Sequence, residues 1–202
     1  TQTLNPADGA SVQFYPKVSD FSEFNQLKDS FEAYRFLSFT VTVRPLFNVS
    51  GPDNSIAPYV LAPFHSTITV AVPFNDAQSL NKSKLYHGTS TAVRTFVPAV
   101  LSLTRYAKPD GNLDVTASKI NWRPRIEIDN HSDSIRHFTC LLVWDKVTQP
   151  KSMATQAYST VQYEITCSAK IMMYTQKSIN IVTTYYSKCF IISILRFRGL
   201  QS

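Results

Sequence analysis

The sequence predicts an all-β protein, a two-sheet antiparallel sandwich with one or two short helices and long loops. Short runs of alternating apolar and polar residues recur along the 202 residues, which is the pattern of half-buried strands. Aromatic residues make up 12% of the chain, and aromatic and β-branched residues favour strands. No strand–helix–strand rhythm is visible, so about eight strands in antiparallel sheets are favoured over a parallel sheet.

The longest strand is predicted over residues 161–174. Its odd-numbered residues, from Val161 to Met173, are apolar, whereas its even-numbered residues are mostly polar, with Met172 as the exception. Because successive side chains of a strand point to opposite faces, the odd-numbered side chains would lie in the core. We therefore expect this strand to have a central place in its sheet.

The N-terminal part is predicted as a short strand, a short helix and a second long strand. Residues 11–15 form the first strand. Ser19 and Asp20 are predicted to cap a helix, because apolar residues recur at helical spacing from Phe21 to Phe31. Residues 34–44 then alternate in the same way as residues 161–174, which predicts the second long strand.

The middle of the chain is predicted as short elements joined by polar connections. Strands are expected over residues 67–72, which prolines flank, and over residues 91–100. A short helix is expected over residues 75–80, after an Asn-Asp pair that suits a helix start. Residues 82–88 and 101–118 read as loops.

The last part of the chain contains two further alternating segments, residues 120–128 and 135–145, joined by a polar turn. After Lys177 the pattern blurs. We therefore predict one domain over residues 1–178, and a C-terminal arm or extra strand over residues 179–202.

Charge and composition limit the kind of protein and its partners. The net charge is +6, which favours an anionic partner such as nucleic acid, a membrane surface or a glycan over a merely solvated surface. Three cysteines without metal spacing predict free thiols and a reducing compartment. The apolar stretch near the C-terminus is interrupted by Asn180, Lys188 and Arg196, so no membrane insertion is predicted.

No chemistry-bearing constellation is visible. The four histidines lie in no metal-ligand spacing, and the five glycines form no phosphate-binding loop. Candidate acids, bases and nucleophiles do not cluster in the sequence. The sequence therefore predicts no enzyme, no metal and no cofactor.

Dispersed basic residues are the candidate nucleic-acid-binding groups. Arginine and lysine neutralise phosphates, and aromatic rings stack on unpaired bases. Arg123 and Arg125 would share the polar face of one strand. The open alternative is cross-strand pairing with Glu127, Asp129 and Glu164. The full candidate set is Lys17, Arg35, Arg44, Lys119, Trp122, Arg123, Arg125 and Lys170.

The order of motifs resembles that of circovirus-like capsid proteins, from Rep-encoding single-stranded DNA viruses. Residues 31–36 (Phe-Glu-Ala-Tyr-Arg-Phe) and the alternating residues 38–45 resemble the YR-x-x-x-V-x-V-x-x-x-P block of that group. The helical segment before this block, the Phe96-Val97-Pro98 triplet and the three closing strands agree with it too. The similarity covers roughly residues 11–176. These proteins usually begin with an Arg-rich arm, which this sequence does not contain.

The resemblance implies a single jelly roll, an eight-stranded antiparallel β-sandwich with strands named B to I, whose last strand pairs near the N-terminal strand. It implies a viral capsid protein that self-assembles into a small icosahedral shell, about 60 copies in the simplest case. The basic inner surface would package a single-stranded DNA genome. The protein would then be found in the virion, and in the host-cell nucleus or cytoplasm during assembly. A host-cell receptor or a sulfated glycan would be a further partner.

Two alternative functions stay open at this point. One is a jelly-roll coat protein of a small RNA virus. The other is a non-viral β-sandwich that binds glycans through tyrosine and tryptophan on exposed loops. The lack of a disulfide framework and of a signal peptide disfavours the glycan-binding module.

Overall fold

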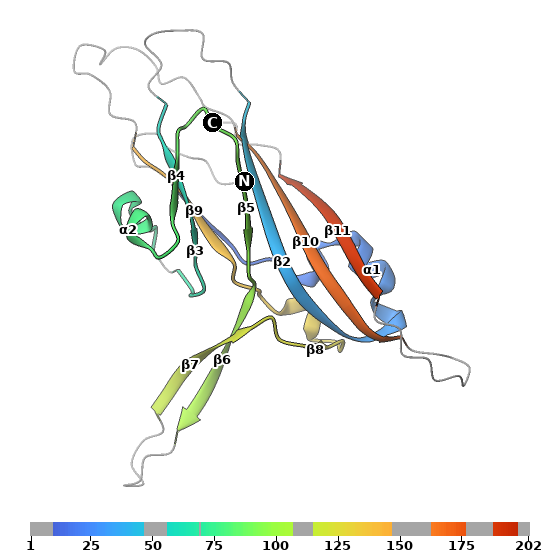
Figure 1. The fold of residues 1–202 in the computed structure, drawn as a ribbon. Coiled ribbons are helices and arrows are strands. Elements are labelled where there is room, and N and C mark those ends of the chain that lie inside the picture. The colour runs from blue at the N-terminus through green and yellow to red at the C-terminus, as the bar shows by residue number, and fades with distance from the viewer. Residues whose placement is uncertain are drawn as a thin grey trace, which may run out of the picture.

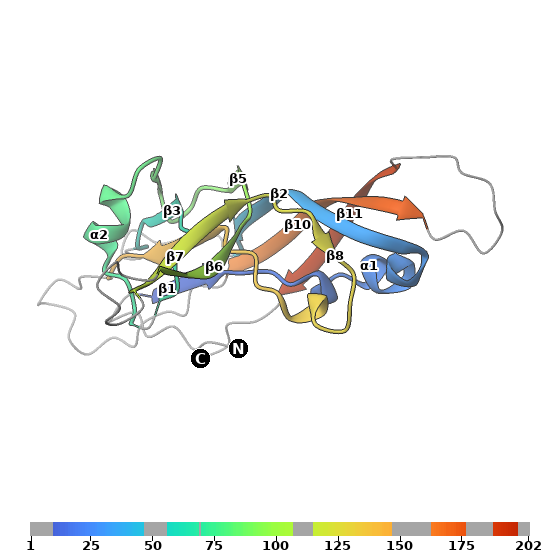
Figure 2. The ribbon, with the colours of Figure 1, turned by 90° about the horizontal axis from the view of Figure 1, so that it is seen from below.

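The protein is an all-β sandwich from which one hairpin projects (Figures 1 and 2). The structure is a computed structural model that describes residues 10–46, 56–68, 70–106, 115–146, 163–176 and 188–197. The first sheet has the order β1 (Ala10–Phe14), β9 (Cys140–Trp144), β3 (Tyr59–Pro63) and β4 (Lys84–Tyr86). The second has the order β11 (Lys188–Phe197), β10 (Tyr163–Gln176), β2 (Phe31–Pro45) and β5 (Ala92–Phe96), and β8 (Ile126–Glu127) also pairs with β2. The hairpin consists of β6 (Ala99–Tyr106) and β7 (Val115–Trp122).

Short helices fill the connections between the strands. The first connection contains α1 (Ser22–Leu27) between two 3-10 turns, η1 (Val18–Asp20) and η2 (Lys28–Ser30). The second helix is α2 (Phe74–Ser79), and a third 3-10 turn, η3 (Ser132–Ser134), follows β8. Both predicted helices are therefore present. The predicted cap is wrong, because Phe21 is the N-cap of α1 and makes no side-chain hydrogen bond there. Asp20 instead accepts a hydrogen bond from the backbone N–H of Lys17, at 2.8 Å.

The strand β10 has the face assignment that the sequence predicts. Its odd-numbered side chains from Tyr163 to Met173 are all buried, at 9% exposure or less, whereas Lys170 is exposed. It pairs with β2 from Tyr163, opposite Pro45, to Gln176, opposite Phe31. The expected central place is confirmed, because β10 lies between β2 and β11.

The expected neighbour of β10 is wrong. The N-terminal strand β1 pairs with β9 in the other sheet, and β10 pairs with β2 and β11. Strand length explains this choice. The strands β2 and β10 have 15 and 14 residues, so pairing them with each other satisfies many backbone hydrogen-bonding groups that the five-residue β1 could not satisfy.

The core has two parts, on either side of the first sheet. The larger part fills the space between the sheets and is rich in aromatic residues. The smaller part lies under α2 and consists of Val60, Ala62, Ala77, Leu141 and Val143. The strands β3 and β9 are therefore buried on both faces.

Two predicted elements of the middle region are wrong. The described residues of the segment 67–72 form no strand: Thr67 is exposed and Val70 is 75% exposed. The strand lies earlier, at β3, whose last residue is Pro63, a position that a proline can occupy. Residues 101–118 contain most of the β6–β7 hairpin instead of a loop, and residues 82–88 contain β4.

The predicted strand over residues 120–128 is interrupted. Arg123 has a φ of 47°, a left-handed conformation that ends a regular strand. Trp122 therefore belongs to the hairpin, opposite Ala99, whereas Ile126 belongs to the second sheet, opposite Tyr34. The predicted strand over residues 135–145 begins later, at Cys140.

Two of the three cysteines, the predicted C-terminal segment and membrane insertion remain to be compared with the sequence predictions. Cys140 and Cys167 are buried free thiols, as the sequence predicts. Of the predicted loop over residues 101–118, positions 107–114 lie outside the described residues. The strand β11 lies within the predicted C-terminal segment, and the division of the chain at residue 178 stays a prediction. No helix in the described ranges is long and apolar enough to cross a membrane.

Candidate nucleic-acid interface

The outer face of the second sheet carries hydroxyl groups along its middle and charged groups at its ends. Side chains of β2 and β10 that alternate with the buried ones point away from the core. Thr40 also lies 2.8 Å from the hydroxyl of Thr95 on β5. The outward-facing pairs are Arg44 with Glu164, Thr42 with Thr166, Thr40 with Ser168, Ser38 with Lys170 and Arg35 with Met172.

Two arginines flank one tyrosine at the β8 end of this face. The guanidinium carbons of Arg35 and Arg125 lie 5.6 and 5.0 Å from the ring centroid of Tyr174, within the range of cation–π attraction. The Nε of Arg35 is buried and has no hydrogen-bond partner among the described residues. Lys170 is exposed on β10, two residues from Met172, which lies opposite Arg35. Two predicted arginines therefore lie beside a tyrosine that the prediction missed, and the predicted Lys170 lies further along the same strand. We call Arg35, Arg125, Lys170 and Tyr174 the tyrosine cluster.

The alternative role of these cations, cross-strand ion pairing, is not seen in the described part of the chain. The ion pair found there joins Lys28 to Asp133, at 2.7 Å. Asp129 instead accepts backbone hydrogen bonds from His131 and Ser132, and these bonds lower the pKa of its carboxyl group. The cations of the tyrosine cluster are therefore not neutralised by the described carboxylates.

A second group of cations lies where the edges of the two sheets meet. Arg94 of β5 donates hydrogen bonds to the carbonyl of Leu61, at 2.6 Å, and to that of Lys82, at 3.0 Å. Its guanidinium lies 5.2 Å from the ring of Phe96, and the ammonium of Lys84 lies 5.2 Å from the ring of Tyr86. We call Lys82, Lys84 and Arg94 the edge cluster. Lys82 and Lys84 are exposed, and the prediction missed both because their segment reads as a polar connection.

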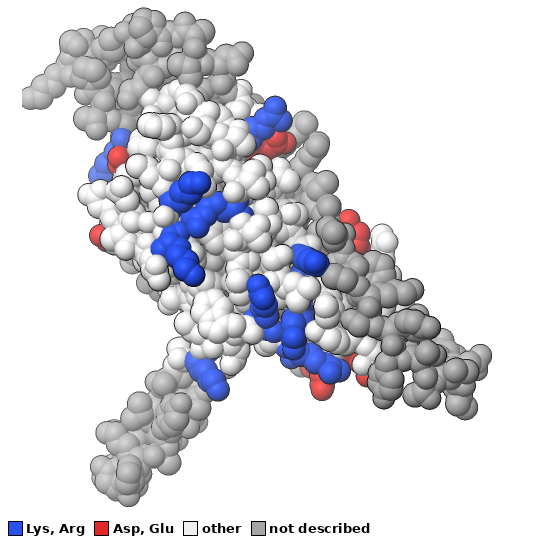
Figure 3. All heavy atoms as spheres, in the orientation of Figure 1, with Lys and Arg blue, Asp and Glu red and all other residues white. Residues whose placement is uncertain are grey.

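Both clusters lie on one side of the molecule. Figure 3 shows two groups of basic side chains on the face seen in Figure 1, one over β4 and β5 and one over the β8 end of β2 and β10. Arginine, lysine and hydroxyl groups donate hydrogen bonds to phosphate oxygens, and an aromatic ring that is accessible, such as the half-buried Tyr174, can stack on an unpaired base. This face can therefore bind a single-stranded nucleic acid along its backbone.

The remaining predicted residues lie elsewhere. Lys17 is half-buried between β1 and η1, and Arg44 lies at the far end of β2. Lys119 and Trp122 are on the hairpin, and Arg123 is exposed in the turn after it. The sequence alternation that placed Arg123 beside Arg125 does not hold, because the strand breaks at Arg123.

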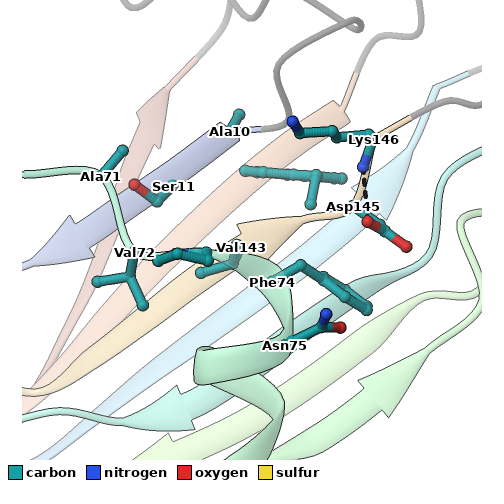
Figure 4. A pocket seen from close by; sticks show the side chains of 11 residues that line it. Ala10, Ser11, Ala71, Val72, Phe74, Asn75, Val143, Asp145 and Lys146 are labelled. Carbon is teal, nitrogen blue, oxygen red and sulfur yellow. Dashed lines mark hydrogen bonds between the residues drawn. The ribbon is translucent and has the colours of Figure 1, made fainter.

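The described residues form no metal site, and they line a groove. They contain no group of three or more histidine, cysteine, aspartate or glutamate side chains that could hold a metal ion. A groove of about 370 Å³ lies between β1 and the start of α2 (Figure 4). Its charged residues are Asp145 and Lys146, and the backbone N–H of Lys146 donates to the Asp145 carboxylate at 2.8 Å. Its remaining lining residues are Ala10, Ser11, Ala71, Val72, Pro73, Phe74, Asn75, Val143 and Trp144.

The two antiparallel sheets form a jelly-roll fold. The BFDV capsid protein in its 60-mer form matches with a TM-score of 0.59 at 13% identity, covering 90% of this chain and 91% of that one. Its decameric form matches with a TM-score of 0.51 at 14% identity, covering 81% and 83% of the two chains. Residues 1–177 match the circovirus capsid protein family, so this chain belongs to that family. The capsid protein of Human associated cyclovirus 1 is 28% identical over 169 residues, which are 83% of this chain and 75% of that protein.

Family membership confirms the resemblance drawn from the sequence motifs, and the jelly-roll fold confirms the expected architecture. The chain is a viral capsid protein with a structural role, and thus a component of a virion. The roles of Lys17, Arg35, Arg44, Lys119, Trp122, Arg123, Arg125 and Lys170 in binding nucleic acid stay predictions.

Proposed function

We propose that about 60 copies of this chain form a closed icosahedral shell that packages single-stranded DNA on the basic face of the second sheet. Family membership and the 60-mer formed by the BFDV capsid protein support the shell. The observation that carries the packaging role is the presence of two cationic clusters on one side of the molecule, without carboxylate partners among the described residues.

The binding mode follows from the groups present. The guanidinium groups of Arg35 and Arg125 and the ammonium of Lys170 neutralise phosphates, and the central hydroxyls donate hydrogen bonds to phosphate oxygens. Such contacts carry no sequence information, so binding is independent of base order. The Tyr174 ring adds stacking on bases. No step of this function requires an acid, a base or a cofactor, and the protein is not an enzyme in this proposal.

The same cations would also attract other polyanions. A sulfated glycan presents anionic groups much as a phosphate backbone does, so a host-cell receptor of this kind would compete with DNA for the exposed cations. Assembly would take place in the host-cell nucleus or cytoplasm. Family membership favours this function over an RNA-virus coat protein and over a glycan-binding module.

Electron microscopy of the purified chain tests the shell. Closed particles of uniform size are expected in some part of a screen of salt concentration and pH. A chain that stays monomeric in every condition would contradict the shell, whatever its affinity for DNA.

Fluorescence anisotropy with a labelled oligothymidine tests the packaging face. The Arg35→Gln/Arg125→Gln variant should bind at least tenfold more weakly than the wild type. Its plot of log K against log salt should be less steep by about 1.4, since each phosphate contact with a single strand contributes roughly 0.7.

Arg136 offers a matched control for this measurement. Its guanidinium lies 4.9 Å from the ring of Tyr15, the same kind of contact, but Tyr15 follows β1 in the first sheet. Arg136→Gln should bind oligothymidine as the wild type does. Equal affinities of the wild type and the double variant would place the genome contact elsewhere.

A further inference from the structure

The β6–β7 hairpin has one apolar face that the described residues leave uncovered. Its register puts Trp122 opposite Ala99, Ile120 opposite Leu101, and Leu103 opposite Ser118. Because opposed residues share a face, these six side chains lie together. Leu103 is 76% exposed, Trp122 55% and Ile120 42%. Together they present on the order of a few hundred Å² of apolar surface, which is the scale at which surface patches mark interaction sites.

The other face of the hairpin carries the polar side chains of Ser102, Lys119 and Asn121 beside Val100. Ser102 lies opposite Lys119, and Asn121 donates a hydrogen bond to the Ser102 hydroxyl at 2.9 Å. The hairpin is therefore amphipathic, as a strand pair is when one face is buried and the other meets water.

The hairpin is fixed at its root. The N–H of Arg123 donates to the carbonyl of Pro98 at 3.1 Å, and Ala99 exchanges backbone hydrogen bonds with Phe138 at 3.0 and 2.8 Å. The Trp122 ring meets the His65 ring edge to face, with centroids 4.5 Å apart. Beyond this root the two strands pair only with each other among the described residues, and they point away from both sheets (Figures 1 and 2). The described part of the sandwich therefore covers the root of this face at Ala99 and leaves Leu103, Ile120 and Trp122 exposed.

We propose that a second copy of this chain covers the apolar face of the hairpin, so that the hairpin is an arm that joins neighbouring subunits. This inference rests on the proposed shell, in which every subunit must contact others through the same surfaces. A two-stranded hairpin is marginally stable by itself in water. Burial of Leu103, Ile120 and Trp122 against a neighbour would therefore stabilise the arm and the assembly together.

The chemistry of Leu103 and Ile120 favours a protein partner over nucleic acid. The aliphatic side chains of Leu103 and Ile120 can neither neutralise phosphates nor stack on bases. Among the hairpin side chains that the structure describes, the cationic one, Lys119, lies on the opposite face. An apolar protein surface is the complement of this patch, and every subunit of a shell brings the same patch to its neighbours.

Site-specific photocrosslinking of the full chain tests the proposal directly. A benzophenone amino acid at position 103 should link two copies of the chain when particles form, and mass spectrometry would identify the peptide that it reaches. The same group at position 102, on the polar face, is the matched control and should give at least tenfold less linked dimer.

Substitution provides the second measurement. The Leu103→Lys/Ile120→Lys variant should raise the protein concentration needed for assembly at least tenfold. Its melting temperature as an unassembled chain should stay close to that of the wild type, because both side chains are exposed. Ser102→Lys adds a charge to the opposite face and should assemble as the wild type does.

The outcomes separate this inference from the proposed function. Shells that form in the wild type without linking through position 103, or that form equally well with both lysines, would overturn the arm and leave the shell intact. A wild-type chain that never associates would overturn both. Should the double variant fail to fold, the crosslink in the otherwise unchanged chain still decides.

Discussion

His137 is a fully buried titratable side chain packed between aromatic rings. It is 0% exposed, and its ring centroid lies 4.4 Å from that of Phe36 and 5.8 Å from that of Tyr34. Burial lowers the pKa of the imidazole to about 4 and outweighs the backbone carbonyls of Pro16 and Ile135, which favour the charged form. The native protein therefore holds His137 neutral at physiological pH.

This depressed pKa predicts a loss of stability in mild acid. An unfolded histidine titrates near pH 6.5, so below that value protons bind the unfolded chain first and favour it. The stabilising effect is complete above about pH 6.5 and is lost as the pH falls toward 4. Between pH 7.5 and pH 5 the wild type should lose about 2 kcal/mol more than His137→Phe, which keeps a ring but cannot titrate. Urea unfolding at the two pH values measures this difference.

Exposed His131 gives the control for the acid experiment. His131→Gln should retain the pH dependence of the wild type, because this side chain lies on the surface. The same pH dependence in the wild type and in His137→Phe would show that His137 does not control the acid response.

At the scale of the element, β10 allows the face assignment to be tested with neighbouring residues. Ile165 is 9% exposed and belongs to the core, whereas Thr166 faces outward opposite Thr42. Ile165→Asp should destabilise the protein by several kcal/mol, about 3 or more, because an unpaired charge would be buried. Thr166→Asp should fold with less than about 1 kcal/mol of loss. Thermal unfolding of both variants measures this, and equal losses would contradict the face assignment.

The elements that the sequence predicts well are those with one buried face. The strands β2 and β10 alternate, so their period identifies both their type and their inward side chains. The strand β3 is buried on both faces and shows no alternation, so the prediction placed a strand in residues 67–72 instead. The left-handed backbone of Arg123 does not disturb the alternation of apolar and polar residues around it. The sequence therefore predicts one strand where the structure has β7 and β8.

The sequence predicts the candidate site only in part, as it does the strands. The sequence identifies Arg35, Arg125 and Lys170 as candidate cations, because the charge of a side chain follows from its residue type alone. It does not show that β2 and β10 pair in the register that brings Tyr174 between the two arginines. Register depends on contacts between segments distant in the chain, and a single sequence does not contain it.

At the scale of the whole molecule, the charge of many identical chains opposes assembly. Each chain has a net charge of +6, and a shell of such chains repels itself until salt or a polyanion neutralises it. Light scattering at low salt should show assembly with single-stranded DNA and much less without it. Salt should reduce this difference by screening the repulsion. If the extent of assembly depended neither on DNA nor on salt, charge repulsion would not control the formation of the shell.

Within the edge cluster, Arg94 has a structural role besides the proposed binding of the genome. Its guanidinium joins the edge of the second sheet to carbonyl groups of β3 and of the segment before β4, and so it fastens the two layers of the sandwich together. A substitution of Arg94 that changed the affinity for the genome would therefore also destabilise the fold of the subunit. Selection on packaging and selection on folding therefore act on the same side chain, whereas the exposed side chain of Lys84 beside it contacts the Tyr86 ring and is not part of this link between the layers.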